Sequence, residues 1–154
     1  MTDADQPSMG RFDGRTHVLP VRIYYEDTDF SGLVYHANYV RYFERGRSDF
    51  LRAIGISHSA LLETDPPTAF ALIRLAVEFK KPARIDDALL VATTYDAILG
   101  PRLLITQKLL RKGDALAEAA VEACCISLSG RPKKPPATLV DRLTPLLAPA
   151  ASDF

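Results

Sequence analysis

The sequence predicts a single α+β domain in which one long helix packs across an antiparallel sheet. Residues 36–54 carry apolar side chains at helical spacing, and four segments with the composition of strands follow them. Turn-forming residues separate these segments at the spacing of hairpins, as in an antiparallel sheet. The apolar stripe of the helix and the apolar face of the sheet must both be shielded from water, so each should cover the other.

The length and composition are those of one globular domain. A chain of 154 residues buries roughly 68–70% of its unfolded surface on folding, which is enough for a core without disulfides or metals. Nineteen basic residues balance nineteen acidic ones, so no overall field attracts nucleic acid or an anionic membrane. No apolar run approaches the ~20 residues of a transmembrane segment, and no secretory signal is visible.

The first predicted elements are a strand, a loop and the helix. His17–Tyr25 is rich in valine, isoleucine, leucine and tyrosine, which favours a strand, and residues 26–32 form a loop. The helix covers His36–Ile54, with Gly55 as its stop. Arg47 lies near the centre of the apolar stripe, which leaves two interpretations open: a side chain that extends to water at the edge of the stripe, or a buried ion pair.

Four further strands are predicted after the helix. Apolar and charged residues alternate over Ala69–Lys80, as in a half-buried strand. The turn signals that follow delimit strands at 89–99 and 102–111. The last segment, Ala115–Ser129, is ambiguous because its alanines and glutamates favour a helix by propensity. Its place at the end of a meander makes a strand the better prediction.

Both ends are predicted to be flexible tails around a domain at residues 17–133. Residues 1–16 are polar and lack periodicity, and residues 134–154 are rich in proline. Cys124 and Cys125 are adjacent, which suits packing residues rather than a structural disulfide. This use of cysteine is typical of a reducing, cytoplasmic compartment.

The stretch that carries chemistry is YYEDTDFSGLVYHANY, residues 24–39. Three carboxylates, a glycine and a histidine precede the helix there. The first turn of a helix has backbone N–H groups without intrahelical partners, and these attract an electron-rich oxygen. A carboxylate held nearby can act as a base or a nucleophile. Together they are the minimum required for hydrolysis of an acyl group.

The run YYEDTDFSGLVYHANYVRYFERGRSDFL resembles the signature of the hotdog-fold acyl-CoA thioesterases. It is most similar to the branch associated with the Tol-Pal envelope system, a relative of the 4-hydroxybenzoyl-CoA thioesterases. The resemblance extends over residues 18–133 and includes the pattern VEFKKPARIDDALLV after the helix. It implies a five-stranded antiparallel sheet wrapped around one long central helix. It also implies dimers formed by edge-to-edge pairing of sheets, often paired into tetramers, with active sites at the dimer interface.

Residue by residue, the resemblance assigns roles within this motif. Asp29 matches the catalytic carboxylate, and His36 matches the position whose backbone N–H polarises the thioester carbonyl and whose imidazole belongs to the active site. Gly32 matches the loop glycine that lets the chain approach the acyl group, and Asn38 matches an asparagine early in the helix, where a structural hydrogen bond is an alternative role. Residues 30–31, Phe-Ser, depart from the small residues common there, so the pocket beside Asp29 should differ in shape.

Other candidate contacts are less specific. Tyr35 is either a wall of the acyl pocket or an aromatic residue of the core or interface. Arg131 and Lys133, and alternatively the basic residues of 80–84, could meet the phosphates of coenzyme A. Charged residues at strand ends are also commonly just solvated, which is the alternative for both clusters.

No metal or redox cofactor is expected. A cation held by Glu26, Asp27, Asp29 and His36 is conceivable, but side chains alternate in direction if the strand continues, which argues against it. The expected partners are an acyl-CoA substrate, further copies of the chain as a homodimer or homotetramer, and an acyl-carrier protein. The resemblance also implies a cytoplasmic protein at the inner face of the membrane.

Hydrolysis of acyl-CoA thioesters to a free acid and coenzyme A is therefore the predicted function. The sequence leaves open whether the carboxylate attacks the carbonyl or activates water. Two alternatives also remain: a non-catalytic module that binds acyl-CoA or acyl-carrier protein, and a hydratase or dehydratase on the same fold.

Overall fold

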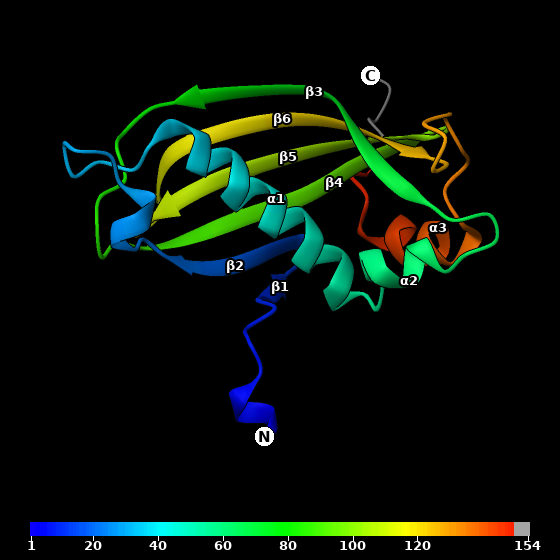
Figure 1. Cartoon of the computed structure of the whole chain (residues 1–154), viewed down its shortest axis with the longest axis horizontal. Coiled ribbons are helices and arrows are strands. Elements are labelled where there is room, and N and C mark those ends of the chain that lie inside the picture. Colours follow the sequence, from blue (N-terminus) through cyan, green and yellow to red (C-terminus); the bar gives the residue numbers. More distant parts are fainter. Residues whose placement is uncertain (150–154) are drawn as a thin grey trace.

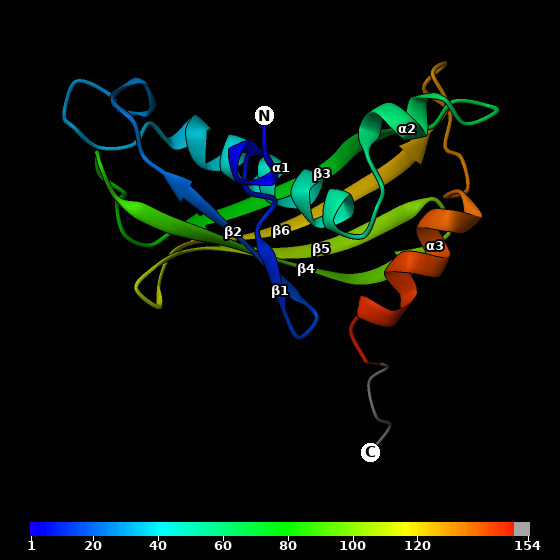
Figure 2. The ribbon, with the colours of Figure 1, turned by 90° about the horizontal axis from the view of Figure 1, so that it is seen from below.

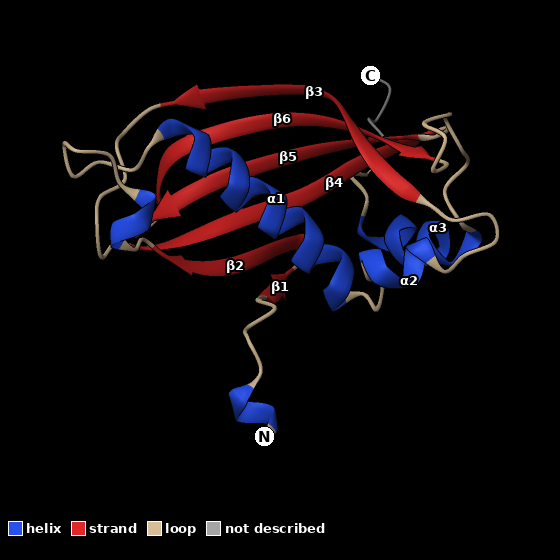
Figure 3. Cartoon of the chain, viewed as in Figure 1, coloured by secondary structure: helices blue, strands red, loops and turns tan. Residues whose placement is uncertain are grey.

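In the computed structural model, which describes residues 1–149, one curved sheet holds a helix against its inner face. Figure 1 shows α1 lying diagonally across the sheet, Figure 2 shows it on one face of the sheet, and Figure 3 shows α2 and α3 together at one end. All strand pairs are antiparallel, in the order β1-β2-β4-β5-β6-β3. The strands are β1 (Arg11–Asp13), β2 (Thr16–Arg22), β3 (Ala69–Phe79), β4 (Ala88–Leu99), β5 (Arg102–Arg111) and β6 (Asp114–Ile126). The helices are α1 (His36–Ala53), α2 (His58–Leu62) and α3 (Ala137–Leu143), with 3-10 turns η1 (Asp3–Asp5), η2 (Tyr25–Asp27) and η3 (Thr144–Leu146).

The α+β class and the antiparallel sheet are as predicted, but the prediction of five strands and one helix is wrong in number. The sixth strand is β1, which lies in the region expected to be a tail. Gly14, with φ +61°, turns the chain so that Asp13 pairs with Thr16. The ring of Phe12 then packs against that of Phe50 on α1, 5.0 Å between centroids, which holds this short strand on the sheet.

The packed part of the chain also extends beyond the boundary expected at residue 133. Leu139 and Leu143 of α3 are completely buried in the main core, because α3 closes the end of the sheet near α2. Although this region is rich in proline, it is therefore not a tail before the end of η3. Residues 150–154 lie outside the described part of the chain.

The helix α1 begins at the expected residue and ends one residue early, at Ala53. Its apolar side contributes Tyr39, Phe43 and Phe50 to the core. The ambiguous last segment is indeed a strand, β6, because it pairs with β5 on one side and β3 on the other. Two ladders of hydrogen bonds outweigh the helical propensity of its alanines.

The helix α1 approaches the sheet closely at Gly46. A β-carbon there would lie 2.6 Å from Val91 Cγ1, 2.8 Å from Thr93 Oγ1 and 3.0 Å from Gln107 Nε2. All three of these residues are completely buried. Only glycine fits at this position, so the choice of residue 46 fixes how deeply the helix sits in the sheet.

We predict that Gly46→Ala destabilises the fold. Alanine would gain about 1 kcal/mol of helix propensity, but overpacking costs about 1–3 kcal/mol, so the expected net effect is a loss of up to about 2 kcal/mol. Urea unfolding followed by circular dichroism measures it. Arg41→Ala, on the exposed side of the same helix, is the control and should stay within about 0.5 kcal/mol. A more stable Gly46→Ala protein would show that the side chains around residue 46 move aside without a cost in stability.

Candidate active site

Functional groups gather in two places, one at each end of β3. The first is the helix-start junction, residues 24–38, which runs from η2 into α1 beside the carboxyl end of β3. The second is a cavity beside the amino end of β3, between α1, α2 and the sheet, which we call the α1–α2 cavity. Figure 1 shows the elements that border them, the start of α1 for the first and α2 for the second, at opposite ends of the molecule.

The helix-start junction is held together by one carbonyl. Asp27 O accepts the backbone N–H of Tyr35 at 3.0 Å and the Asn38 side-chain amide at 2.8 Å. Thr28 and Val34 form an isolated antiparallel bridge, so the segment between them is a tight protruding loop. Asn38 is buried, and its amide is committed to this contact. It therefore fixes the loop to the first turn of α1.

Asp29 lies on this loop with an exposed side chain. Its Oδ1 accepts the Ser31 backbone N–H at 2.8 Å and also the Ser31 hydroxyl. These hydrogen bonds hold the pKa of the Asp29 carboxyl below its usual value, with a smaller contribution from the backbone N–H of Leu33. Gly32, with φ +82°, donates its N–H to Asp29 O and closes the turn.

The amino end of α1 lies exposed beside this loop. Within residues 1–149, the backbone N–H groups of His36 and Ala37 have no acceptor. The ring of His36 lies 4.5 Å from that of Tyr35 and 6.5 Å from that of Phe79, the last residue of β3. Two free donors and one ionised carboxylate therefore occur together at the start of the helix.

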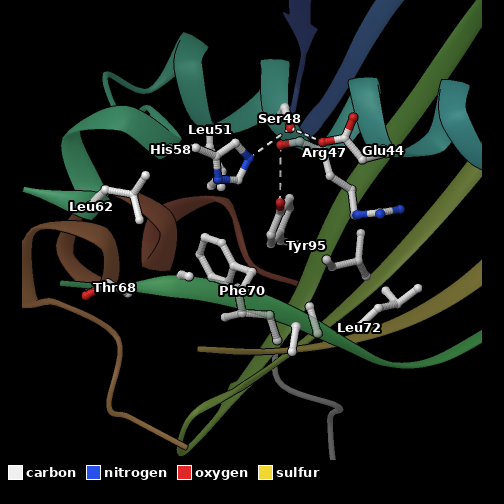
Figure 4. Close-up of a pocket in the computed structure, with 15 residues that line it drawn as sticks. Glu44, Arg47, Ser48, Leu51, His58, Leu62, Thr68, Phe70, Leu72 and Tyr95 are labelled. Atoms are coloured by element: carbon white, nitrogen blue, oxygen red, sulfur yellow. Dashed lines mark hydrogen bonds between the residues drawn. The ribbon is translucent and has the colours of Figure 1, made fainter. Parts of the chain in front are cut away.

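The α1–α2 cavity has a volume of about 340 Å³ (Figure 4). Most of its wall is apolar: Leu51, Leu62, Phe70, Leu72, Leu103 and Ile105. Such a volume and lining are typical of small-molecule pockets. The polar groups at the cavity are mainly on α1 and α2.

Three of those polar groups have the composition of a hydrolytic triad. Ser48 Oγ lies 2.7 Å from Glu44 Oε1 and 2.9 Å from His58 Nε2. The order of contacts differs from a serine nucleophile, where histidine accepts the hydroxyl proton and the acid holds the histidine. Here the serine donates to the carboxylate, so His58 Nε2 must carry a proton and donate to Ser48. The serine is bound from both sides and is not activated.

Arg47 at the same cavity is partly exposed and does not form the buried ion pair that was one of its two predicted roles. Its guanidinium donates to Gln107 Oε1 at 3.0 Å, and it has no carboxylate within 4.0 Å in residues 1–149. Gln107 in turn donates to Phe43 O at 2.7 Å, and Tyr95 O–H donates to Arg47 O at 3.3 Å. Burial lowers the pKa of Arg47. The arginine is thus held by a hydrogen-bonded network between helix and sheet.

The remaining predicted contacts belong to the cavity end. Lys133 Nζ donates to Thr68 Oγ1 at 2.6 Å, and Thr68 lines the cavity. Arg131 O accepts the Ser127 N–H on the same strap after β6. Both cysteines are buried and free, and burial raises the pKa of the Cys125 thiol to about 12. Cys125 is therefore a protonated packing residue.

Within one chain, the structure brings together Asp29, Gly32, Tyr35, His36 and Asn38, but not Arg131 or Lys133. From Phe70 to Phe79 the strand advances nine residues, or about 30 Å at roughly 3.3 Å per residue. Sequence reasoning missed the cavity residues of α1 and α2. The available signal was the spacing of Glu44 and Ser48, which places them on one face of the helix.

Two further findings limit the chemistry of the described residues. Among residues 1–149, no cluster of three or more His, Cys, Asp or Glu side chains is arranged to bind a metal ion. No helix in this range combines the length and hydrophobicity needed to cross a bilayer.

Comparison with known proteins gives one consistent result. The model of the thioesterase-like superfamily matches residues 24–143. The acyl-CoA thioesterase YbgC of Haemophilus influenzae is 40% identical over 110 residues, which cover 71% of this chain and 80% of the relative. The acyl-CoA thioester hydrolase YbgC of Escherichia coli O6:H1 is 39% identical over 123 residues, with coverages of 79% and 90%. The crystal structure of a probable thioesterase from Bartonella henselae has a TM-score of 0.77 and 36% identity, with coverages of 79% and 99%.

The contacts of Ser48 lead to a chemical prediction. A fluorophosphonate probe, which labels serines activated by a neighbouring base, should leave Ser48 unmodified. Intact-mass spectrometry after incubation of the native protein would detect an adduct. A serine hydrolase of known reactivity serves as the positive control, and stoichiometric labelling lost in Ser48→Ala would contradict the assignment.

Proposed function

Because the chain belongs to the thioesterase-like superfamily and is an acyl-CoA thioester hydrolase of the hotdog fold, we propose that Asp29 and the amino end of α1 carry out the hydrolysis. The observation that carries this proposal is the pairing of an exposed, ionised carboxylate with two unpartnered helix-start N–H groups on one junction. Hydrolysis of a thioester needs these two groups on opposite sides of a carbonyl.

The chemistry follows from the junction. The thioester oxygen accepts the His36 N–H, which stabilises the negative charge that develops as the carbonyl is attacked. In one route the Asp29 carboxylate takes a proton from water, the water oxygen attacks the carbonyl carbon, and the coenzyme A thiolate leaves with that proton. In the other, the Asp29 carboxylate attacks the carbonyl carbon and expels the coenzyme A thiolate, which leaves a mixed anhydride. Water then hydrolyses the anhydride, which regenerates the Asp29 carboxylate, releases the free acid and supplies the proton that the thiolate takes up.

The acyl group requires a pocket, and the α1–α2 cavity is the best candidate by size and lining. Its near wall at Glu44 lies eight residues along α1 from His36, or about 12 Å, and its far wall at Phe70 lies about 30 Å along β3 from Phe79. The Asp29 side chain spans neither distance, so the junction and the cavity are separate within one chain.

A second copy resolves this separation. β3 is a long edge strand with one side unpaired, and Leu72, Ile73 and Phe79 on it are about half exposed. Long apolar edges are normally covered by pairing. In an antiparallel pair of β3 strands, the amino end of one lies beside the carboxyl end of the other. The junction of one copy would then meet the cavity of its partner.

This arrangement also gives roles to the strap after β6. Arg131 and Lys133 lie at the cavity end, so in the dimer they would stand near the junction of the second copy. Their cations could hold the phosphates of coenzyme A while the acyl group occupies the cavity. Gly32 and Tyr35 would border the thioester from the other copy.

The setting of the protein is a separate expectation. Two buried, unpaired thiols support a reducing, cytoplasmic compartment. Tetramers, an acyl-carrier protein as a partner and a position at the inner membrane face rest on the family resemblance alone.

Removal of the carboxylate tests the proposal directly. Asp29→Asn should lose at least about a hundredfold in kcat, the effect of deleting a catalytic acid–base group. A free-thiol assay across short, long and aromatic acyl-CoA substrates measures it, with Asp13→Asn, an exposed aspartate on β1, as the control. A folded Asp29→Asn protein with near-native thiol release would refute the assignment. Single turnover in oxygen-18 water separates the two routes, because only the anhydride route places label in Asp29.

The same assay distinguishes the alternative functions. Saturable acyl-CoA binding by the native protein without thiol release would favour a binding module. Conversion of the acyl chain with the thioester intact would favour a hydratase or dehydratase.

The edge of β3 gives a second prediction. Ile73→Lys places a charge on the free edge of the strand, so we expect the dimer to dissociate and thioesterase activity to fall by about tenfold or more at low protein concentration. Light scattering after gel filtration reports the mass. Ile85→Lys, at a comparably exposed isoleucine outside the strand, is the matched control. A fully active monomer would exclude the shared site.

A further inference from the structure

We propose that Ser31 is a positioning residue, whose hydroxyl holds Oδ1 of Asp29 so that Oδ2 is the oxygen that reacts. This inference rests on the proposed catalytic function of Asp29 and names the contact that orients it.

Two donors of one residue converge on one oxygen. The Ser31 backbone N–H donates to Asp29 Oδ1 at 2.8 Å, and the Ser31 hydroxyl donates to the same atom. Within residues 1–149, Asp29 Oδ2 accepts no hydrogen bond within 3.5 Å and has no cation within ion-pair distance, although the Leu33 backbone N–H is near enough to lower the pKa of the carboxyl. The two carboxylate oxygens are therefore inequivalent: one is anchored to the loop, and the other is free to meet a substrate.

The two hydrogen bonds from Ser31 to Asp29 Oδ1 require this particular loop. The backbone places residue 31 next to its own aspartate because Asp29 N–H donates to Leu33 O at 2.8 Å and Gly32 N–H donates to Asp29 O at 3.1 Å. The backbone N–H would donate with any residue except proline at position 31. The hydroxyl donor is present only with serine or threonine, so this second hydrogen bond depends on the identity of residue 31.

Hydrogen bonds to the charged form also keep the carboxylate ionised. The Ser31 hydroxyl is the largest of the influences that lower the pKa of Asp29, and no charged side chain is among them. Of the other titratable groups near this carboxylate, Asp27 Oδ2 accepts the Tyr24 N–H, and the His36 ring packs between Tyr35 and Phe79. Within residues 1–149, neither Glu26 of the junction nor Arg84, whose backbone pairs with Leu33, forms an ion pair. The serine is thus the contact whose loss should change the ionisation of Asp29.

The sign of the pH effect follows. Both routes require ionised Asp29, so activity falls as the pH drops through the pKa of that carboxyl. Ser31→Ala removes one hydrogen bond to the charged form and raises this pKa. The variant should therefore lose activity at a higher pH than the native enzyme does, on the acidic side of the profile.

The experiment compares Ser31→Ala, Ser31→Thr and the native dimer in kcat and KM over the pH range in which each stays folded. At neutral pH we expect Ser31→Ala to lose about tenfold in kcat with little change in KM, because the carboxylate is less well oriented. The ratio of variant to native kcat should fall further as the pH is lowered. Ser31→Thr, which keeps the hydroxyl, should have the native kcat and should lose activity at the same acidic pH as the native protein.

The control is Ser8→Ala. Ser8 Oγ accepts the backbone N–H of Gly10 at 3.0 Å in the exposed amino-terminal region, so this variant removes a serine hydroxyl from a comparable local contact outside the proposed site. It should leave kcat, KM and the pH profile unchanged. Circular dichroism of each variant shows whether the fold is retained.

The outcomes separate this inference from the proposed function. A ratio of Ser31→Ala to native kcat that does not vary with pH, or a Ser31→Thr variant no better than alanine, would overturn the positioning role while Asp29→Asn stayed inactive. An active Asp29→Asn variant would instead overturn the proposed function and, with it, the role of Ser31.

Discussion

The carbonyl of Asp27 is the contact on which the proposed chemistry depends. By accepting hydrogen bonds from Tyr35 and Asn38, it ties the loop that carries Asp29 to the first turn of α1. The Thr28–Val34 and Leu33–Arg84 bridges restrain the loop as well, but loss of the Asp27 contact would loosen its position relative to the helix. The carboxylate and the helix-start donors would then meet only at the expense of conformational entropy, which a catalytic site avoids by fixing its groups beforehand.

The sheet gives that junction its place relative to the second copy. Gly46 allows α1 to lie directly on β4 and β5, and the helix then runs from the carboxyl end of β3 toward its amino end. The junction and the α1–α2 cavity consequently stand at opposite ends of the edge strand. In the proposed dimer, antiparallel pairing of two β3 edges would place the junction of one copy beside the cavity of the other.

The sequence predicted what is encoded by local patterns. The boundaries of α1 and β3, and the cluster from Asp29 to Asn38, follow from periodicity and from a contiguous motif. β1 was not predicted because the packing of Phe12 against Phe50 keeps it on the sheet, and these two residues are distant in sequence. α3 was missed because the prolines on either side of it resemble a tail, whereas Leu139 and Leu143 pack into the core. The contacts of Arg47 and His58 likewise depend on tertiary packing, so no local pattern in the sequence could identify them.

The division of functional groups between the two ends of β3 has a consequence for inheritance. If each site draws its carboxylate from one chain and its cavity from the other, a mixed dimer can join a chain damaged only at the junction to a chain damaged only at the cavity. One of its two sites would then combine the two undamaged halves. Two alleles that are each inactive alone would thus complement each other in the same cell, which an enzyme with its whole site inside one chain would not allow.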